Sequence, residues 1–408
     1  MITRLLSYGA GEGIAKGLNI ALIILLPLII SPENYGVVAL AVALEQILLN
    51  VFLFAQSTAV LRNYDRFRRY GNTFFRSLEL AHTRFSIILF VIGCLIMLAL
   101  YGYISDLASL FLILCAAPFL ARLQMLQTLQ RVRDLVAGYL KYRLLYQVVK
   151  FFLVLCLAVI PSLEAVSYSL GTLSSAIFTL LLFRDWGVRE NKVRENKRLS
   201  KKMFLFSVPL AAQMVMNSLY SVADRYVLLY MSNKVDVAIY TFSYSIGTTL
   251  LFIANIFVIV YLPKVYREKN GLEKSIRILD GMLIRLFVLM VIAGVIVNFI
   301  IYPHMLSYYE PIYARGERVL SIAVLAVILK TFYLYGLYKL TLFRTLESIP
   351  LISAVVLSFN LCANIILIPR FGLEGAAYAT LLSEALGCTL ILVRSSQVCR
   401  LKAVRACE

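Results

Sequence analysis

The sequence predicts an all-α integral membrane protein with about 12 transmembrane helices, arranged as two six-helix bundles around a central cavity. Three observations indicate this fold class: the apolar composition, a series of long apolar segments, and an internal repeat. The chain of 408 residues is 61% hydrophobic and only 15% charged, with a mean hydropathy of +0.84. A water-soluble fold cannot bury so large an apolar fraction, so lipid must cover much of it.

The apolar segments are each about 20 residues long, which is the length of a helix that crosses a bilayer. We expect no cleavable signal peptide, because the first segment follows Arg4 and Lys16 and has no small-residue cleavage site behind it. The predicted spans are residues 10–30, 37–61, 77–100, 107–130, 141–160, 165–183, 204–231, 237–262, 281–302, 319–340, 349–369 and 374–395.

Basic residues alternate between the connections. The connections after spans 2, 4, 6, 8 and 10 hold 24 lysines and arginines, whereas the other six hold 4. Basic connections are retained in the cytoplasm, so both termini of this multi-pass membrane protein are expected there. The net charge of +18 is therefore mainly a topology signal, and no nucleic-acid partner is predicted.

One long polar connection divides the chain. We predict an N-terminal six-helix lobe (1–183), a basic cytoplasmic linker (184–203), a C-terminal six-helix lobe (204–396) and a cytoplasmic tail (397–408). The two halves repeat, and parallel repeats with an even number of spans give lobes related by an axis along the membrane normal. The matching positions are Ile160-Pro161, Leu163-Glu164 and Tyr168 with Ile368-Pro369, Leu373-Glu374 and Tyr378, and Glu12, Lys16 and Asn19 with Gln213, Asn217 and Tyr220.

Polar residues recur on one face of several spans. On span 1 they follow the spacing i, i+4, i+7, and span 7 continues this spacing to i+11. Unsatisfied polar groups are costly in lipid, so these faces must point to the interior. The candidate substrate-binding residues are Lys16, Asn19, Gln213, Asn217, Arg225 and Lys330, and the candidate ion-coupling residues are Glu12, Glu45 and Asp224.

Structural roles compete with these functional ones. Asp224 and Arg225 can form a salt bridge of their own, and Glu12 and Lys16 can form an ordinary helical ion pair. Lys16 can also reach the cytoplasmic interface. Lys330 has no acidic residue within a turn of the helix. Three other cations nearer the span ends are expected to be interfacial anchors: Arg84, Lys150 and Arg285.

The strongest motif is Asn-x-x-x-Asn-x-x-x-Ile-Pro-Arg-Phe-Gly-x-x-Gly-Ala-Ala-x-Ala-Thr, from Asn360 to Thr380. Pro369 ends the first helix of a hairpin, Gly372 permits the reversal, and Gly375 with its neighbouring alanines allows close helix packing. This hairpin resembles that of the polysaccharide transporters, which include O-antigen flippases, in the superfamily that also holds the multidrug extruders. In that family spans 1, 2, 7 and 8 line the cavity between the lobes.

The resemblance implies a flippase that moves an oligosaccharide on a polyprenyl (pyro)phosphate, such as an O-antigen or other surface-polysaccharide repeat unit, to the outer leaflet by alternating access. Its partners would be the lipid-linked oligosaccharide, membrane lipids and a polysaccharide polymerase. The sugar composition, the oligomeric state and the coupling ion (H⁺ or Na⁺) cannot be read from the sequence.

Two alternatives remain at this point. One is a small-molecule or multidrug exporter of the same superfamily, whose cavity should be acidic for cationic drugs. The other is a membrane-embedded polysaccharide polymerase or glycosyltransferase, but the longest outer connection, 304–318, is short for a catalytic domain. The sequence has no phosphate-binding glycine-rich loop, and its seven cysteines have no metal-ligand spacing. We therefore expect no enzyme activity, no cofactor and no metal.

Overall fold

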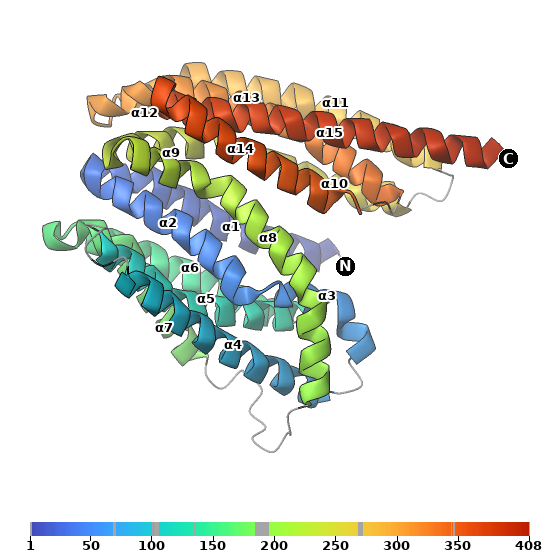
Figure 1. Cartoon of the computed structure of the whole chain (residues 1–408), viewed down its shortest axis with the longest axis horizontal. Coiled ribbons are helices and arrows are strands. Elements are labelled where there is room, and N and C mark those ends of the chain that lie inside the picture. The colour runs from blue at the N-terminus through green and yellow to red at the C-terminus, as the bar shows by residue number, and fades with distance from the viewer. Residues whose placement is uncertain are drawn as a thin grey trace. The chain divides into compact units, whose positions relative to one another are not determined.

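The computed structural model describes residues 2–67, 71–99, 101, 106–133, 135–183, 196–267, 272–343, 345 and 347–407. Every regular element within these ranges is a helix (Figure 1). Eleven stretches of the described residues are long and apolar enough to cross a membrane. The predicted all-α membrane fold is therefore confirmed.

The helices fall into two compact units, Met1–Leu219 and Tyr220–Glu408, with the division inside α8. Unit 1 contains α1 (Ile2–Leu25), η1 (Leu26–Leu28), α2 (Pro32–Leu53), α3 (Gln56–Phe67), α4 (Gly71–Ala99), α5 (Leu107–Val132), α6 (Val136–Ala158), η3 (Pro161–Val166), α7 (Ser167–Leu182) and most of α8 (Lys197–Met231). Unit 2 contains the end of α8, α9 (Lys234–Thr248), α10 (Leu251–Arg267), α11 (Leu272–Ile296), η5 (Val297–Ile301), α12 (Tyr302–Leu306), η6 (Pro311–Gly316), α13 (Glu317–Leu342), α14 (Ile349–Phe371) and α15 (Leu373–Cys407).

The predicted domain boundaries stay predictions. Residues 184–195 of the expected linker lie outside the described residues, and residues 197–203 already belong to α8. The expected tail from 397 onward continues α15 as a helix as far as Cys407.

The predicted span 141–160 is α6, which is 23 residues long. It is not among the eleven apolar stretches. It carries three cations close together, Lys141, Arg143 and Lys150. A helix with this composition must turn its cations away from lipid, and the environment of Lys150 described below shows that it does.

Two predicted spans are interrupted. The span expected at 37–61 ends as α2 at Leu53, because Phe54 and Ala55 have positive φ angles of 47° and 52°. The chain then continues as α3. The span expected at 237–262 is likewise divided into α9 and α10, which are separated at Thr249 and Leu250. Apolar composition runs through both breaks, so hydropathy alone could not reveal them.

The hairpin of α14 and α15 follows the prediction with one correction. α14 does not end at Pro369 but continues to Phe371 and ends at Gly372, whose φ is 58°. A proline in the last turn removes only one backbone hydrogen bond, whereas a positive φ stops the helix. The expected close packing is present, since a Cβ on Gly375 would lie 2.3 Å from the carbonyl oxygen of Leu367.

The two glutamates of the internal repeat each contact the start of another helix in their own unit. The Glu164 carboxylate accepts a hydrogen bond from Asn34 Nδ2 at 2.7 Å, at the beginning of α2. Glu374 lies 3.4 Å from Arg318 Nη1, at the beginning of α13. Each glutamate thus ties the final hairpin of its unit to an earlier helix.

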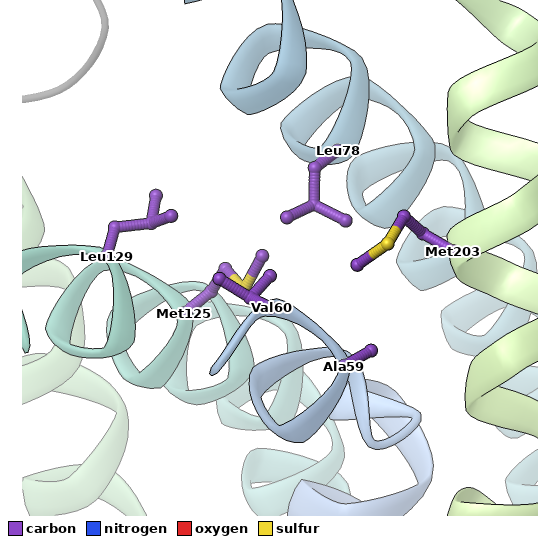
Figure 2. Packing of buried hydrophobic residues seen from close by; sticks show 6 residues of the cluster. All are labelled: Ala59, Val60, Leu78, Met125, Leu129 and Met203. Atoms are coloured by element: carbon purple, nitrogen blue, oxygen red, sulfur yellow. The ribbon is translucent and has the colours of Figure 1, made fainter. Parts of the chain in front are cut away.

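Apolar side chains hold unit 1 together where four helices meet. Leu78 of α4 and Met203 of α8 point toward Val60 of α3 and Met125 of α5 (Figure 2). Ala59 and Leu129 complete this cluster, and all six side chains are buried. Burying such side chains between helices fixes the position of α5, which also forms one wall of the site described next.

Candidate functional site

Unit 1 contains a polar cavity of about 280 Å³ between five of its helices, α1, α2, α5, α6 and α7. Of its sixteen lining residues, eleven carry a charge, an amide or a hydroxyl group. The lining residues are Ala15, Lys16, Asn19, Val42, Glu45, Gln46, Leu49, Leu120, Leu123, Gln124, Gln127, Arg143, Tyr146, Gln147, Lys150 and Tyr168. We call this space the unit 1 cavity.

Lys150 of α6 is the most buried charge in the unit 1 cavity, with a side chain only 3% exposed. Its Nζ lies 3.1 Å from Oε2 of Glu45 on α2 and donates to the Tyr168 hydroxyl of α7 at 2.8 Å. Tyr168 in turn donates to Glu45 at 2.7 Å. These three side chains satisfy one another, which is what permits a cation at this depth.

A second group joins α1 to α6. Arg143 Nε lies 3.2 Å from Oε1 of Glu12, and the Tyr139 hydroxyl donates to the same oxygen. The Arg143 and Glu12 side chains are 28% and 33% exposed. This pair is therefore much better hydrated than the Lys150 group, and its guanidinium remains accessible from the unit 1 cavity.

The unit 1 cavity has an excess of positive charge. Three cations line it (Lys16, Arg143 and Lys150), against one carboxylate, that of Glu45. Four glutamines and Asn19 add amide groups, and the amide nitrogen of Gln147 is buried with no hydrogen-bond partner among the described residues. Such a lining suits an anionic group that also presents hydrogen-bonding oxygens.

The predicted residues of the first two spans come together here. Lys16 and Asn19 of α1 are exposed side chains that line the unit 1 cavity, and Glu45 of α2 lies opposite Lys150. Glu12 lies on α1 next to the lining and contacts Arg143. Their roles in binding substrate or ions stay predictions.

The predicted residues of span 7 are divided between the units. Gln213 and Asn217 lie in the part of α8 that belongs to unit 1 but do not line its cavity. Next to them, the Ser218 hydroxyl accepts a hydrogen bond from Asn50 of α2 at 2.5 Å. In unit 2, Asp224 and Arg225 are both buried, at 2% and 8% exposure.

Asp224 does not form the salt bridge with Arg225 that the sequence left open. Its carboxylate accepts hydrogen bonds from the Tyr240 hydroxyl and from the backbone N–H of Arg225. The Arg225 Nε is buried without a hydrogen-bond partner among the described residues. Neighbouring positions on a helix point in different directions, which explains why the two side chains do not pair.

Lys330 of α13 has a partner that the sequence did not indicate. Its Nζ lies 2.6 Å from Oε1 of Glu384 on α15, and the ammonium group is 5.6 Å from the centre of the Tyr220 ring. The Glu384 side chain is 9% exposed and that of Lys330 is 32% exposed. Lys330 is thus a paired cation of unit 2, and it does not line the unit 1 cavity.

The main omission of the sequence analysis is the cavity face of α6. Lys150 was expected to be an interfacial anchor, and this expectation is wrong, because its side chain is buried and lines the unit 1 cavity. Arg143, which was not among the candidates, lines the same cavity. A signal was present, since Arg143, Gln147 and Lys150 have the spacing i, i+4, i+7 that marked Glu12, Lys16 and Asn19 on span 1.

The apolar helices define a polytopic membrane protein, and unit 1 encloses a cavity lined largely by polar residues. More particularly, the chain belongs to the family described as "Polysaccharide biosynthesis protein", whose model matches residues 4–267. No curated protein matches the chain.

Solved structures share its fold. A multidrug resistance MATE family transporter of the MOP superfamily, in an inward-facing conformation, aligns with a TM-score of 0.73 and 15% identity over 94% of this chain and 95% of that chain. The lipid II flippase MurJ, in an inward closed conformation, aligns with a TM-score of 0.76 and 13% identity over 95% of this chain and 87% of that chain. The MATE multidrug transporter DinF-BH aligns with a TM-score of 0.64 and 16% identity over 97% of this chain and 95% of that chain. At these identities the similarity establishes the fold of a MOP-superfamily transporter and leaves the substrate open.

Proposed function

We propose that this chain is a flippase that carries an oligosaccharide, linked to a polyprenyl (pyro)phosphate, from the inner to the outer leaflet of the bacterial cytoplasmic membrane by alternating access. The observation that supports this most directly is the charge of the unit 1 cavity, which three cations and one carboxylate line. A phosphate group needs cations to offset its loss of water, and sugar hydroxyls can use the surrounding amides.

The comparisons support the same class of substrate. The matching family is one of polysaccharide biosynthesis, and one protein of the same fold is a flippase of lipid II. By analogy we infer that the cargo is an O-antigen or similar surface-polysaccharide repeat unit. A polysaccharide polymerase that consumes the delivered unit is the natural protein partner.

The membrane potential favours outward movement of such a cargo. In a cell that is negative inside by about 100 mV, each negative charge that leaves gains about 2.3 kcal/mol, so two phosphate charges gain about 4–5 kcal/mol. Coupling to H⁺ or Na⁺ would add to this. Our candidates for that role remain Glu12, Glu45 and Asp224, of which the first two are each paired with a cation of α6.

The other predicted ligands would act beyond the unit 1 cavity. We assign Gln213 and Asn217 to hydrogen bonding with the sugar. Arg225 and Lys330 supply positive charge in unit 2. Arg225 is the stronger of these two candidates, because Lys330 already has Glu384 as a partner.

A multidrug exporter is the second candidate, because two of the compared structures of this fold are multidrug transporters. The chemistry of the unit 1 cavity distinguishes the two functions. A cationic drug would meet three cations and a carboxylate that Lys150 already neutralises. We therefore rank the lipid-linked oligosaccharide first.

Reconstitution in vesicles separates the two candidates. The purified protein should move a fluorescent polyprenyl-diphosphate oligosaccharide between leaflets and should not drive uptake of a fluorescent cationic dye. Uptake of the dye without movement of the lipid would select the exporter. Complementation of a strain that lacks its surface-polysaccharide flippase, followed by glycan analysis, would then identify the sugar.

We predict that both termini and the linker are cytoplasmic. In a cysteine-free background, Lys192→Cys should be protected from an impermeant thiol reagent added to intact cells, because its connection is among the basic ones. Lys234→Cys, in a connection with few basic residues, should be labelled. The opposite pattern of labelling would invert the topology.

Lys16 gives the direct test of substrate binding. If its ammonium group contacts the phosphate, Lys16→Ala should lose a charge-assisted contact of about 1.5–3 kcal/mol, which corresponds to a roughly ten- to hundredfold lower rate of polysaccharide export. Lys16→Arg should retain part of the activity. Export is measured at matched protein levels in the membrane.

Two controls distinguish substrate binding from a structural role of Lys16. Arg84→Ala removes an exposed cation of α4 that does not line the unit 1 cavity, and it should export normally. If Lys16 only balances the charge of Glu12, the double variant Glu12→Ala/Lys16→Ala should recover full export. Such a recovery, or full export by Lys16→Ala alone, would remove Lys16 from the substrate site.

A further inference from the structure

Unit 2 has a second polar pocket, of about 410 Å³, which the function proposed above does not use. It lies where the first turn of α9, the η6–α13 segment and the turn between α14 and α15 meet. These are connections with few basic residues, so the predicted topology puts them on the outer side of the membrane. We call this space the η6 pocket.

Four of the five charged residues of the η6 pocket form two ion pairs. Arg315 Nη2 lies 2.9 Å from Oδ1 of Asp236, and Arg318 Nη1 lies 3.4 Å from Oε1 of Glu374. Both arginine side chains are still largely exposed, at 53% and 77%. A fifth charged residue, Glu317, is exposed, and its carboxylate has no hydrogen bond or ion pair within the described residues.

These charges exclude several kinds of ligand. Three carboxylates against two guanidinium groups leave the lining with a net charge of about −1, which disfavours a phosphate or another anion. A metal ion is also disfavoured, because the described residues contain no cluster of three metal-ligating side chains. An acyl chain does not suit a pocket in which five of the nine lining residues are charged.

With anions, metal ions and acyl chains disfavoured, a neutral sugar is the ligand that fits the η6 pocket. A guanidinium group provides only donors and a carboxylate only acceptors, so the two ion pairs present both kinds of partner to hydroxyl groups, each of which can donate and accept. The side chain of Phe371, 53% exposed, offers an aromatic surface to the C–H face of a sugar ring. The volume also falls within the usual range for small-molecule sites, about 300–1,000 Å³.

The backbone of the turn leaves this space open. Gly372 has a φ of 58°, and a Cβ at this position would meet no atom within 4 Å. A glycine at such a turn lets a ligand approach the main chain closely.

We propose that the η6 pocket is a binding site for a neutral saccharide. The inference rests on the proposed function for its biological meaning, since the sugars of the transported lipid would reach this pocket after crossing the membrane. The saccharide could be the head group of the lipid-linked cargo or part of a finished polysaccharide. Binding itself can be measured without any transport.

The test uses the full chain in lipid nanodiscs, where both faces are accessible. The probes are delipidated bacterial surface oligosaccharides, one neutral set and one acidic set, observed by saturation-transfer NMR. We expect the neutral set to bind and the acidic set to bind weakly or not at all. Preference for the acidic set, or no binding of the neutral set, would overturn the proposal.

Two variants locate the binding. Arg318→Gln and Glu317→Gln should each weaken neutral-saccharide binding by about tenfold or more, the loss of one charged hydrogen bond. Glu317→Gln is the safer variant, since the Glu317 carboxylate makes no hydrogen bond or ion pair in the part of the chain that the structure describes. Arg122→Gln is the control for Arg318→Gln, because both arginines are mostly exposed, at 53% and 77%, and each is paired with a glutamate, but Arg122 lies in unit 1. Equal affinity in all three variants would assign the η6 pocket ion pairs a purely structural role.

Comparison of free with lipid-linked sugars shows where the saccharide binds and from which source it comes. Binding of the same sugars only when they are lipid-linked, unchanged by Glu317→Gln, would place them elsewhere and reject the inference. Binding of free and lipid-linked forms alike would support both sources of the saccharide. A protein that binds neutral sugars through the η6 pocket but moves no lipid in vesicles would refute the proposed function and leave this inference standing.

Discussion

Replacement of Lys150 by methionine is expected to abolish polysaccharide export and to destabilise the protein strongly. The Lys150 ammonium group lies 3.1 Å from Glu45 and 2.8 Å from the Tyr168 hydroxyl, and its side chain is 3% exposed. Removal of one partner from such a pair leaves a buried charge without compensation, at a cost of about 3–5 kcal/mol. Thermal unfolding in nanodiscs measures the stability, and export at matched membrane levels measures the function.

A double variant separates these two effects. Glu45→Gln/Lys150→Met removes both charges, so it should recover most of the lost stability, because a neutral buried pair is often no worse than an ionic one. Export should stay low, because the double variant removes the buried ammonium group itself, although the lining keeps the same excess of positive charge. Full export by the double variant would mean that Lys150 serves only to neutralise Glu45.

The control for position 150 is an ion pair with similar chemistry but different burial. Arg122 and Glu79 lie 2.8 Å apart, with the arginine side chain 53% exposed. Exposed pairs contribute about 1 kcal/mol or less. Arg122→Met should therefore change unfolding slightly and leave export unchanged. If Arg122→Met lost as much stability and export as Lys150→Met, burial would not be the reason for the large effect at Lys150.

The fold could be predicted because the local amino-acid composition indicates where each membrane-spanning helix lies. Lipid requires long apolar segments with internally satisfied backbones, so each span leaves a signature of about 20 residues. The breaks inside the spans could not be predicted in this way. Phe54 and Ala55 adopt positive φ without any glycine to signal it, and the apolar sequence continues on both sides.

The site could be predicted only in part, because a cation in a membrane helix is ambiguous. The polar face of α1 and the carboxylate of Glu45 were expected to face the cavity between the lobes, and the structure has them lining or flanking the cavity inside unit 1. Lys150 could equally have been an anchor at the interface. Only its tertiary partners show which of these roles Lys150 has, and one of them, Glu45, is more than one hundred residues away in sequence. The pairing of Lys330 with Glu384 was missed for the same reason.

Substitution of Gly375 by valine is expected to destabilise unit 2 by about 3 kcal/mol or more. A Cβ at this position would lie 2.3 Å from the carbonyl oxygen of Leu367 and 2.9 Å from the Cα of Ile368. These are backbone atoms of α14, which cannot move aside as the end of a side chain can. Overfilling a packed contact typically costs about 1–3 kcal/mol, and the rigidity of this one puts it at the upper end.

Gly281→Val in α11 is the matched control for this effect. A Cβ at Gly281 would meet no atom within 4 Å, and valine and glycine differ little in helix propensity, so its stability should change by about 0.5 kcal/mol or less. The main difference between the two variants is therefore the space around the new side chain. Thermal unfolding of both in the same nanodiscs gives the comparison. Equal midpoints would show that α14 and α15 can separate at this contact without cost, and the small residues from Gly375 to Ala379 would then need another explanation than close helix packing.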